Sequence, residues 1–222
     1  MAGVPLATGQ APGLDCGVRS SPPILAVFAS GQGSNFQSLT EASLRGELGG
    51  EIRVLVSDRP QAPALDRARR LGIEALTLPV GRFRSRIEDE GAWLEALRER
   101  GVETLLLAGF MRRLHATILE AFPLQVLNIH PSLLPAYPGL DAIGQAWLAG
   151  AKVTGCTVHL VEDALDSGPI LAQSVVALAQ GDTPASLEAR VHEAEHALYP
   201  RTVRRFLTEP WRLEGRRVVW ER

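Results

Sequence analysis

The chain has 222 residues, of which 45% are hydrophobic and 22% charged, and its formal net charge is −2. This charge excludes a strong field that would draw the whole chain to nucleic acid or to an anionic membrane. No apolar run approaches the roughly 18 residues of a membrane span, so we expect a cytoplasmic protein without membrane or nucleic-acid partners. The two cysteines, Cys16 and Cys156, form neither a CxxC nor a zinc pattern, which favours free thiols in a reducing compartment.

Residues 1–22 are rich in Gly, Ala and Pro, and they lack the basic start and continuous apolar stretch of a signal peptide. We therefore predict a disordered leader over 1–22 and a single domain over 23–222. No internal repeat and no linker divides the second segment.

From Ile24 onward, strand-like and helix-like segments alternate. In chain order the sequence predicts a strand over 24–30, a helix over 35–48, a strand over 51–57, a helix over 62–72, a strand over 73–79, a helix over 84–100, a strand over 102–110, a helix over 115–122 and a strand over 124–130. Strands that alternate with helices predict a mostly parallel sheet covered on both faces.

The pattern changes after residue 130. A helix over 141–150 is followed by strands over 154–162 and 168–178, and the short link between these two strands predicts an antiparallel pair. A long helix is expected from Pro184, with Thr183 as its N-cap, and the tail from residue 215 is expected to add one edge strand.

The first candidate site is the glycine-rich turn "ASGQGSNFQSL" over 29–39, between the first strand and the first helix. Free N–H groups at a helix start favour a phosphate, although a simple capped turn is the alternative. The turn lacks the lysine of a Walker loop, and Phe36 takes the place of the third glycine of a dinucleotide fingerprint. Asp58 follows the second strand, at the place of a ribose-binding acid. A nucleotide-binding dehydrogenase or binding module therefore stays an alternative.

The second candidate is "NIHPSLLPAYPGL", in which Asn128 and His130 precede prolines at 131, 135 and 138. Residues i and i+2 of a strand point the same way, so both side chains are expected to face the crevice at the carboxyl end of a parallel strand. The third candidate is Asp166, because a carboxylate beside an imidazole orients the ring and stabilises its protonated form. The alternative for Asn128 and His130 is a polar pair at a strand end. The alternative for Asp166 is a turn-forming aspartate.

Two further segments are ambiguous. "AGFMRRL" over 108–114 follows a very apolar strand and suits a flat heteroaromatic ligand, but a core strand followed by a basic surface turn is the commoner structure. "HEAEH" over 192–196 formally fits the HExxH pattern of a metalloprotease, but no third ligand is evident downstream, so a solvated or partly buried helix face is preferred.

Taken together, these segments resemble the glycinamide ribonucleotide transformylase family, which is folate-dependent. "SGQGSN", "LLLAGFMRRL", "NIHPSLLPAYPGL", "LDSGPIL" and "RVHEAEHALYP" match it in order and spacing over roughly residues 24–208. The resemblance implies a Rossmann-like three-layer α/β fold with an antiparallel C-terminal pair. It also implies transfer of a formyl group from 10-formyltetrahydrofolate to the amine of glycinamide ribonucleotide in purine biosynthesis, without a metal, by a monomer or homodimer.

The resemblance also implies roles for particular residues. Asn128 and His130 would stabilise the oxyanion, and Asp166 would hold His130 protonated. The ribonucleotide would contact Gly33, Ser34, Asn35 and Glu195, and the folate would contact Arg86, Met111, Arg112, Arg113, Leu114 and Asn128. The N-terminal half would bind the ribonucleotide, and the C-terminal half would bind folate and carry out catalysis.

The sequence departs from the family pattern at Ala136, Asp141, Ile143, Arg113 and His192, none of which is one of the three expected catalytic residues. Two related activities share the Asn–His–Asp set. Methionyl-tRNA formyltransferase carries an additional C-terminal domain, and formyltetrahydrofolate hydrolase carries an additional N-terminal domain, and neither is expected in this chain.

Overall fold

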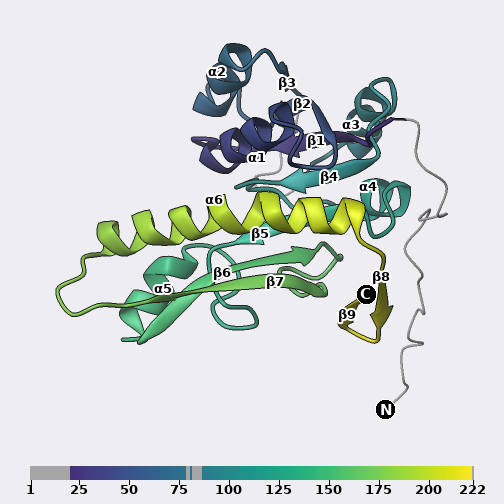
Figure 1. The fold of residues 1–222 in the computed structure, drawn as a ribbon. Helices are drawn as coiled ribbons and strands as arrows, with labels where there is room; N and C mark the ends of the chain where they lie inside the picture. Colours follow the sequence, from purple (N-terminus) through teal and green to yellow (C-terminus); the bar gives the residue numbers. More distant parts are fainter. Residues whose placement is uncertain (1–20, 79–80, 82–86, 222) are drawn as a thin grey trace.

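The computed structural model describes residues 21–78, 81 and 87–221 (Figure 1). Within these residues, nine strands form one sheet in the order β3-β2-β1-β4-β5-β6-β7-β9-β8. The strands are β1 (Ile24–Phe28), β2 (Glu51–Ser57), β3 (Glu74–Thr77), β4 (Thr104–Leu107), β5 (Val126–His130), β6 (Val153–Leu160), β7 (Ile170–Ala177), β8 (Trp211–Glu214) and β9 (Arg217–Trp220). The helices are α1 (Ser34–Leu44), α2 (Pro63–Arg70), α3 (Glu90–Arg98), α4 (Ala116–Ala121), α5 (Ala142–Leu148) and α6 (Pro184–Thr208).

The sheet changes direction in its middle. β3, β2, β1, β4 and β5 pair in parallel, whereas β6 is antiparallel to both β5 and β7. The predicted α/β class, the mostly parallel sheet and the antiparallel pair are therefore confirmed. Because β5 is the last parallel strand, its carboxyl end lies beside the start of the reversed half, where open α/β sheets form ligand crevices.

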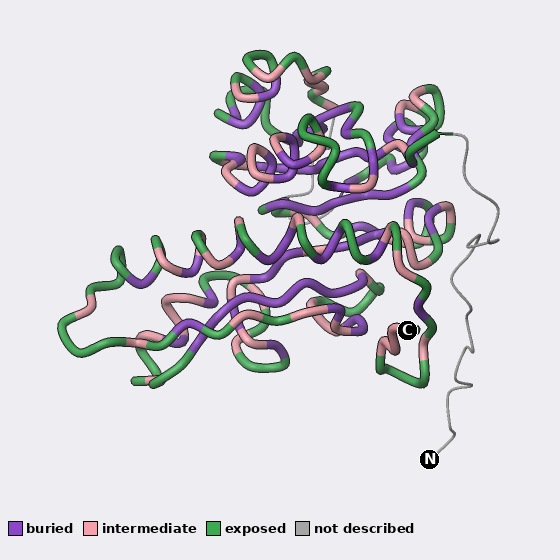
Figure 2. Tube along the Cα trace, viewed as in Figure 1, coloured by how far each residue is buried: buried purple, intermediate pink, exposed green. Residues whose placement is uncertain are grey.

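Helices cover both faces of the sheet. Strand residues that alternate in the chain point to opposite faces, as Val27 and Phe28 do, and each set packs into a separate core. One core is closed by α1, α2 and α6, and the other by α3 and α4. Buried residues gather on the central strands and on the helix surfaces turned toward them (Figure 2).

The long helix α6 lies along β6 and β7 and also reaches the central strands (Figure 1). Thr183 caps it as predicted, by accepting a hydrogen bond from the backbone N–H of Ser186. Farther along, the Tyr199 hydroxyl contacts the carbonyl oxygens of Leu107 in β4 and Leu127 in β5, at 3.1 Å each. These contacts fix α6 against the strand ends that border the candidate site. Among the described residues, no helix is long and apolar enough to span a bilayer.

Three details of the expected elements are wrong. The helix predicted over 84–100 begins at Glu90, because the Asp89 carboxylate accepts hydrogen bonds from two first-turn N–H groups and ends the preceding loop there. The first helix ends at Leu44 rather than at residue 48. The C-terminal tail forms a hairpin with β8, so β8 is the edge strand and β9 lies between β7 and β8. Residues 1–20 of the expected leader lie outside the described residues.

Candidate active site

A cavity of about 360 Å³ opens at the carboxyl ends of β4 and β5. Its wall is built from seven places in the chain: the first turn of α1, the β4–α4 connection, the end of β5, the segment 139–141, the end of β6, the β6–β7 link and one face of α6. The predicted catalytic side chains of Asn128, His130 and Asp166 all line it. The structure therefore brings together three side chains that the sequence separates by up to 38 positions.

Asn128 is held by a histidine that sequence reasoning missed. The antiparallel register sets Asn128 of β5 opposite His159 of β6, and Asn128 Nδ2 lies 3.1 Å from His159 Nε2. His159 Nδ1 lies 2.8 Å from the carbonyl oxygen of Leu160, which can only accept, so Nδ1 carries the proton. Burial lowers the pKa of His159, so the ring is neutral and Nε2 accepts from the Asn128 amide. Because Nδ1 of His159 carries the proton, the Nδ2 end of the Asn128 amide, and not its oxygen, faces the ring.

His130 lies between two acceptors. Its Nε2 donates to the carbonyl oxygen of Tyr137 at 2.9 Å, and its Nδ1 lies 3.5 Å from Asp166 Oδ2. That second distance is an ion-pair contact and is too long for a well-formed hydrogen bond. Both side chains are more than nine-tenths buried, so the interaction is only weakly screened.

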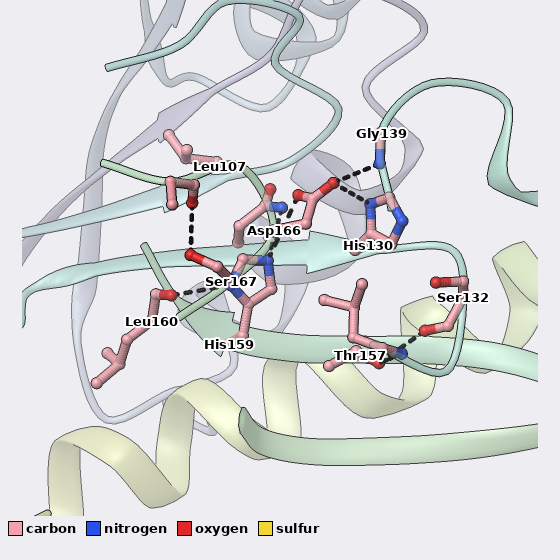
Figure 3. A network of polar contacts seen from close by, with 12 residues as sticks. Leu107, His130, Ser132, Gly139, Thr157, His159, Leu160, Asp166 and Ser167 are labelled. Carbon is pink, nitrogen blue, oxygen red and sulfur yellow. Dashed lines mark hydrogen bonds and ion pairs between the residues drawn. The ribbon is translucent and has the colours of Figure 1, made fainter. Parts of the chain in front are cut away.

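Asp166 is fixed by the backbone as well as by charge. Its Oδ2 accepts a hydrogen bond of 2.7 Å from the N–H of Gly139, and its Oδ1 lies 3.9 Å from His159 Nε2 (Figure 3). Asp166 adopts a positive φ of 47°, an uncommon conformation for a residue with a side chain. The carboxylate is therefore presented to both histidines from a constrained link.

The proline-rich segment after β5 is anchored by a hydroxyl network. The Thr157 hydroxyl of β6 donates to the carbonyl oxygen of Ser132 at 2.6 Å and accepts from the Leu134 N–H at 3.1 Å (Figure 3). Gln173 of β7 donates to the carbonyl oxygen of Leu134 at 2.9 Å. The segment that carries Tyr137 and Gly139 is therefore tied to the reversed half of the sheet, in addition to the restriction that its prolines impose.

The glycine turn meets α2 so closely that Gly33 can carry no side chain. Gly33 has a φ of 73°, and a Cβ built on it would lie 2.6 Å from the Cβ of Ala64. Gly33 is the N-cap of α1, whose first-turn N–H groups have no partner within the helix. Asn35 lines the cavity, whereas Gly33, the N-cap, and Ser34, the first residue of α1, precede it in the chain.

At the α6 side of the cavity, a buried carboxylate joins two elements. Glu195 is 3% exposed, and its Oε2 accepts hydrogen bonds of 2.8 Å from Asn35 Nδ2 of α1 and from His192 Nδ1. The hydrogen bond and charge of Glu195 raise the pKa of His192. Burial lowers the pKa of the next histidine on the helix, His196. The described residues contain no group of three or more His, Cys, Asp or Glu side chains arranged as a metal site.

The residues expected at the folate site line the opposite wall of the cavity. These are Met111, Arg112, Arg113 and Leu114, whereas Arg86 lies outside the described residues. Arg112 Nε lies 2.8 Å from Asp58 Oδ2, and the side chain of Asp58 is only 1% exposed. Asp58 is therefore paired with Arg112 through Oδ2, and it is not among the residues that line the cavity.

The fold and this constellation are those of a group-transferring enzyme. The sequence profile of the formyl transferase family matches residues 24–203. The chain therefore belongs to the formyl transferase family.

Within that family, the similarity is to phosphoribosylglycinamide formyltransferases. The chain is 41% identical over 182 residues to the phosphoribosylglycinamide formyltransferase of Bacillus subtilis, and this match covers 82% of the chain and 93% of that protein. The crystal structure of glycinamide ribonucleotide transformylase 1 from Symbiobacterium toebii superposes with a TM-score of 0.87 at 40% identity, covering 96% of this chain and 100% of that one. A formyltetrahydrofolate deformylase from Pseudomonas syringae, at 24% identity and a TM-score of 0.83 over 91% of this chain and 67% of that one, shares the fold.

Proposed function

We propose that this enzyme transfers the formyl group of 10-formyltetrahydrofolate to the amine of glycinamide ribonucleotide, a step of purine biosynthesis, with the cytoplasm as its compartment. The observation that carries the proposal is the cluster of Asn128, His130 and Asp166 in one cavity. Membership of the family and 41% identity to a phosphoribosylglycinamide formyltransferase support the choice of reaction.

Attack of the amine on the formyl carbon makes a C–N bond and places negative charge on the formyl oxygen. Donors directed at that oxygen stabilise the transition state. Asn128 has one N–H engaged by His159, and its second N–H is available for the oxyanion. The Nδ1 N–H of His130 is the second donor, because its 3.5 Å separation from Asp166 is too long for a well-formed hydrogen bond.

Asp166 holds His130 protonated and receives the proton that the attacking amine must lose, directly or through a water molecule. The departing folate nitrogen takes up a proton as its bond to the formyl carbon breaks, so no covalent enzyme intermediate is needed. His159 is a positioning residue in this scheme: by staying neutral it accepts from Asn128 and orients the amide.

Two binding regions flank the cluster. The ribonucleotide is assigned to Gly33, Ser34, Asn35 and Glu195, where the start of α1 suits a phosphate. The folate is assigned to Met111, Arg112, Arg113, Leu114 and Asn128, with Arg86 as a further predicted contact. The second region contains the exposed apolar side chain of Met111, which suits a flat ring system.

The direct test is to mix the protein with 10-formyltetrahydrofolate and glycinamide ribonucleotide and to follow deformylation of the folate together with formation of the formylated ribonucleotide. Turnover that depends on both substrates is the expected result. Folate deformylation without the ribonucleotide would favour a formyltetrahydrofolate hydrolase instead. Binding of NAD(H) in place of a folate analogue would favour the nucleotide-binding alternative.

A further inference from the structure

We propose that His192 is an affinity-determining residue for the phosphate of the ribonucleotide, because its positive charge neutralises the buried Glu195 carboxylate beside the start of α1. This inference rests on the proposed function and adds a specific dependence on pH. His192, Glu195 and Asn35 all line the cavity, so the charge pair borders the space that the substrate would fill.

The geometry makes the three side chains one unit. Glu195 Oε2 accepts from both Asn35 Nδ2 and His192 Nδ1 at 2.8 Å, which links the first turn of α1 to α6. The other end of the Asn35 amide, Oδ1, is buried and has no hydrogen-bond partner. Asn35 is only 9% exposed, and an unpaired acceptor in such a place is costly unless a ligand supplies the donor. A hydroxyl or N–H group of the bound substrate would satisfy it.

The electrostatic requirement follows from the charges. A buried carboxylate near a helix N-terminus repels an approaching phosphate dianion unless a cation offsets it. Among the described residues, Arg67 of α2 is a second cation near this turn, and its guanidinium donates to the carbonyl oxygen of Gln32 and to the side chain of Gln37. These acceptors are neutral, so Arg67 keeps its charge but is directed to them. His192 is in direct contact with Glu195, so loss of its proton would expose the full carboxylate charge to the phosphate.

Other titratable side chains also lie near His192 and affect the charges on α6. On α6, Glu188 Oε1 lies 3.6 Å from His192 Nε2, and its charge adds to that of Glu195 in raising the pKa of His192. His196 stacks on His192 with 6.5 Å between ring centroids. Burial is the largest cause of the lowered pKa of His196, and the charges on His192 and Arg67 lower this pKa further. The charges of Glu195 and Glu193 raise it. Of the two histidines on this helix, His192 is therefore the one whose charged form is favoured.

The test measures the affinity of ribose 5-phosphate by calorimetry between about pH 7 and about pH 9, where the phosphate itself is already a dianion. We expect the affinity of the unmodified protein to fall roughly fivefold to tenfold across this range, as one partly exposed charge is lost. His192→Gln should start from the weaker affinity and show no such fall. His196→Gln is the matched control, one turn along the same helix, and should keep the dependence on pH.

A spectroscopic readout separates this inference from the proposed function. The His192 ring signal in proton NMR should titrate at higher pH when ribose 5-phosphate is bound, because the dianion stabilises the imidazolium. A pH-independent affinity in the unmodified protein, or an unchanged His192 titration, would overturn the inference even if formyl transfer is found. Phosphate-dependent titration in a protein that transfers no formyl group would support the inference and overturn the proposed function.

Discussion

His159 and His192 line the same cavity, yet their pKa values are displaced in opposite directions. His159 lies on a central strand at 2% exposure, and burial lowers its pKa. The side chain of His192 lies on α6 at 41% exposure, and a hydrogen bond from its ring to Glu195 raises its pKa. The neutral form is therefore favoured at His159 and the charged form at His192.

The difference shows that the contact between a histidine and a carboxylate determines whether the pKa of the ring is raised or lowered. Asp166 also approaches His159, but its nearest oxygen is 3.9 Å away and burial outweighs its charge. Glu195 is in hydrogen-bond contact with His192, and there the carboxylate outweighs burial. In the proposed function, the cavity has a reaction end, at which His159 orients a neutral amide, and a phosphate end, at which His192 supplies charge.

The largest expected effect is at the reaction end. Asp166→Asn removes the only carboxylate that contacts both His130 and His159 among the described residues. We expect the rate of formyl transfer to fall roughly 10²–10⁴-fold, as for loss of a general base. Steady-state rates of the unmodified protein and of the variant would check this loss.

The matched control is Asp163→Asn, in the same link, whose carboxylate is 80% exposed. It should retain most of the activity. If Asp166→Asn keeps as much activity as Asp163→Asn, the role assigned to Asp166 is wrong.

The next effect tests whether His159 acts as a neutral acceptor. His159→Phe keeps a buried ring but removes the partner of Asn128 Nδ2. We expect kcat to fall roughly 10–100-fold, because an Asn128 amide that is no longer held in place donates less well to the oxyanion of the transition state. The KM for the ribonucleotide should change little, because this amide acts on the transition state and not on the bound ribonucleotide. His159→Gln, whose amide oxygen can still accept, should recover part of the loss. Equal losses in kcat for the two variants would contradict a positioning role.

Much of this architecture could be predicted from sequence, because strand–helix alternation and motif order depend on local patterns. Asn128, His130 and Asp166 were predicted to converge, and they do line one cavity. His159 was missed because its contact depends on the register between β5 and β6, which pairs residues 31 positions apart. The only available signal was its alternation with the buried Cys156, Val158 and Leu160, which directs Thr157 and His159 to the other face.

The α6 motif shows a different limit. The HEAEH segment was interpreted as a partly buried helix face, and its spacing does not reveal that Glu195 is 3% exposed and bonded to α1. Helix periodicity predicts which residues share a face, but the burial of a charge depends on what packs against that face. The contact between α1 and α6 joins residues 160 positions apart, so it follows from tertiary structure alone.

At the phosphate end, Gly33→Ala should produce a moderate effect. The positive φ and the close approach to Ala64 make any side chain unfavourable, so we expect a loss of about 1–3 kcal/mol in the free energy of unfolding. The displaced start of α1 should also raise the KM for the ribonucleotide more than it lowers kcat. Gly31→Ala is the matched control, since a Cβ there would meet no atom within 4 Å. Denaturant titration and steady-state kinetics would separate the two effects, and equal stability of the two variants would contradict the packing argument.

The smallest expected effect is the dependence of stability on pH, where the two histidines should differ in sign. The raised pKa of His192 means that its stabilising contribution is complete below about pH 6.5 and is lost as the pH rises through the folded-state value. The lowered pKa of His159 means that its contribution is present above about pH 6.5 and is lost as the pH falls toward the folded-state value. The Tm of the unmodified protein should therefore exceed that of His192→Gln on the acidic side, and the two values should converge as the pH rises through the folded-state pKa of His192. Over that rise the unmodified protein should lose roughly 1–2 °C more in Tm, a small shift because His192 is partly exposed. A difference that is absent on the acidic side and present only on the alkaline side would contradict the raised pKa of His192.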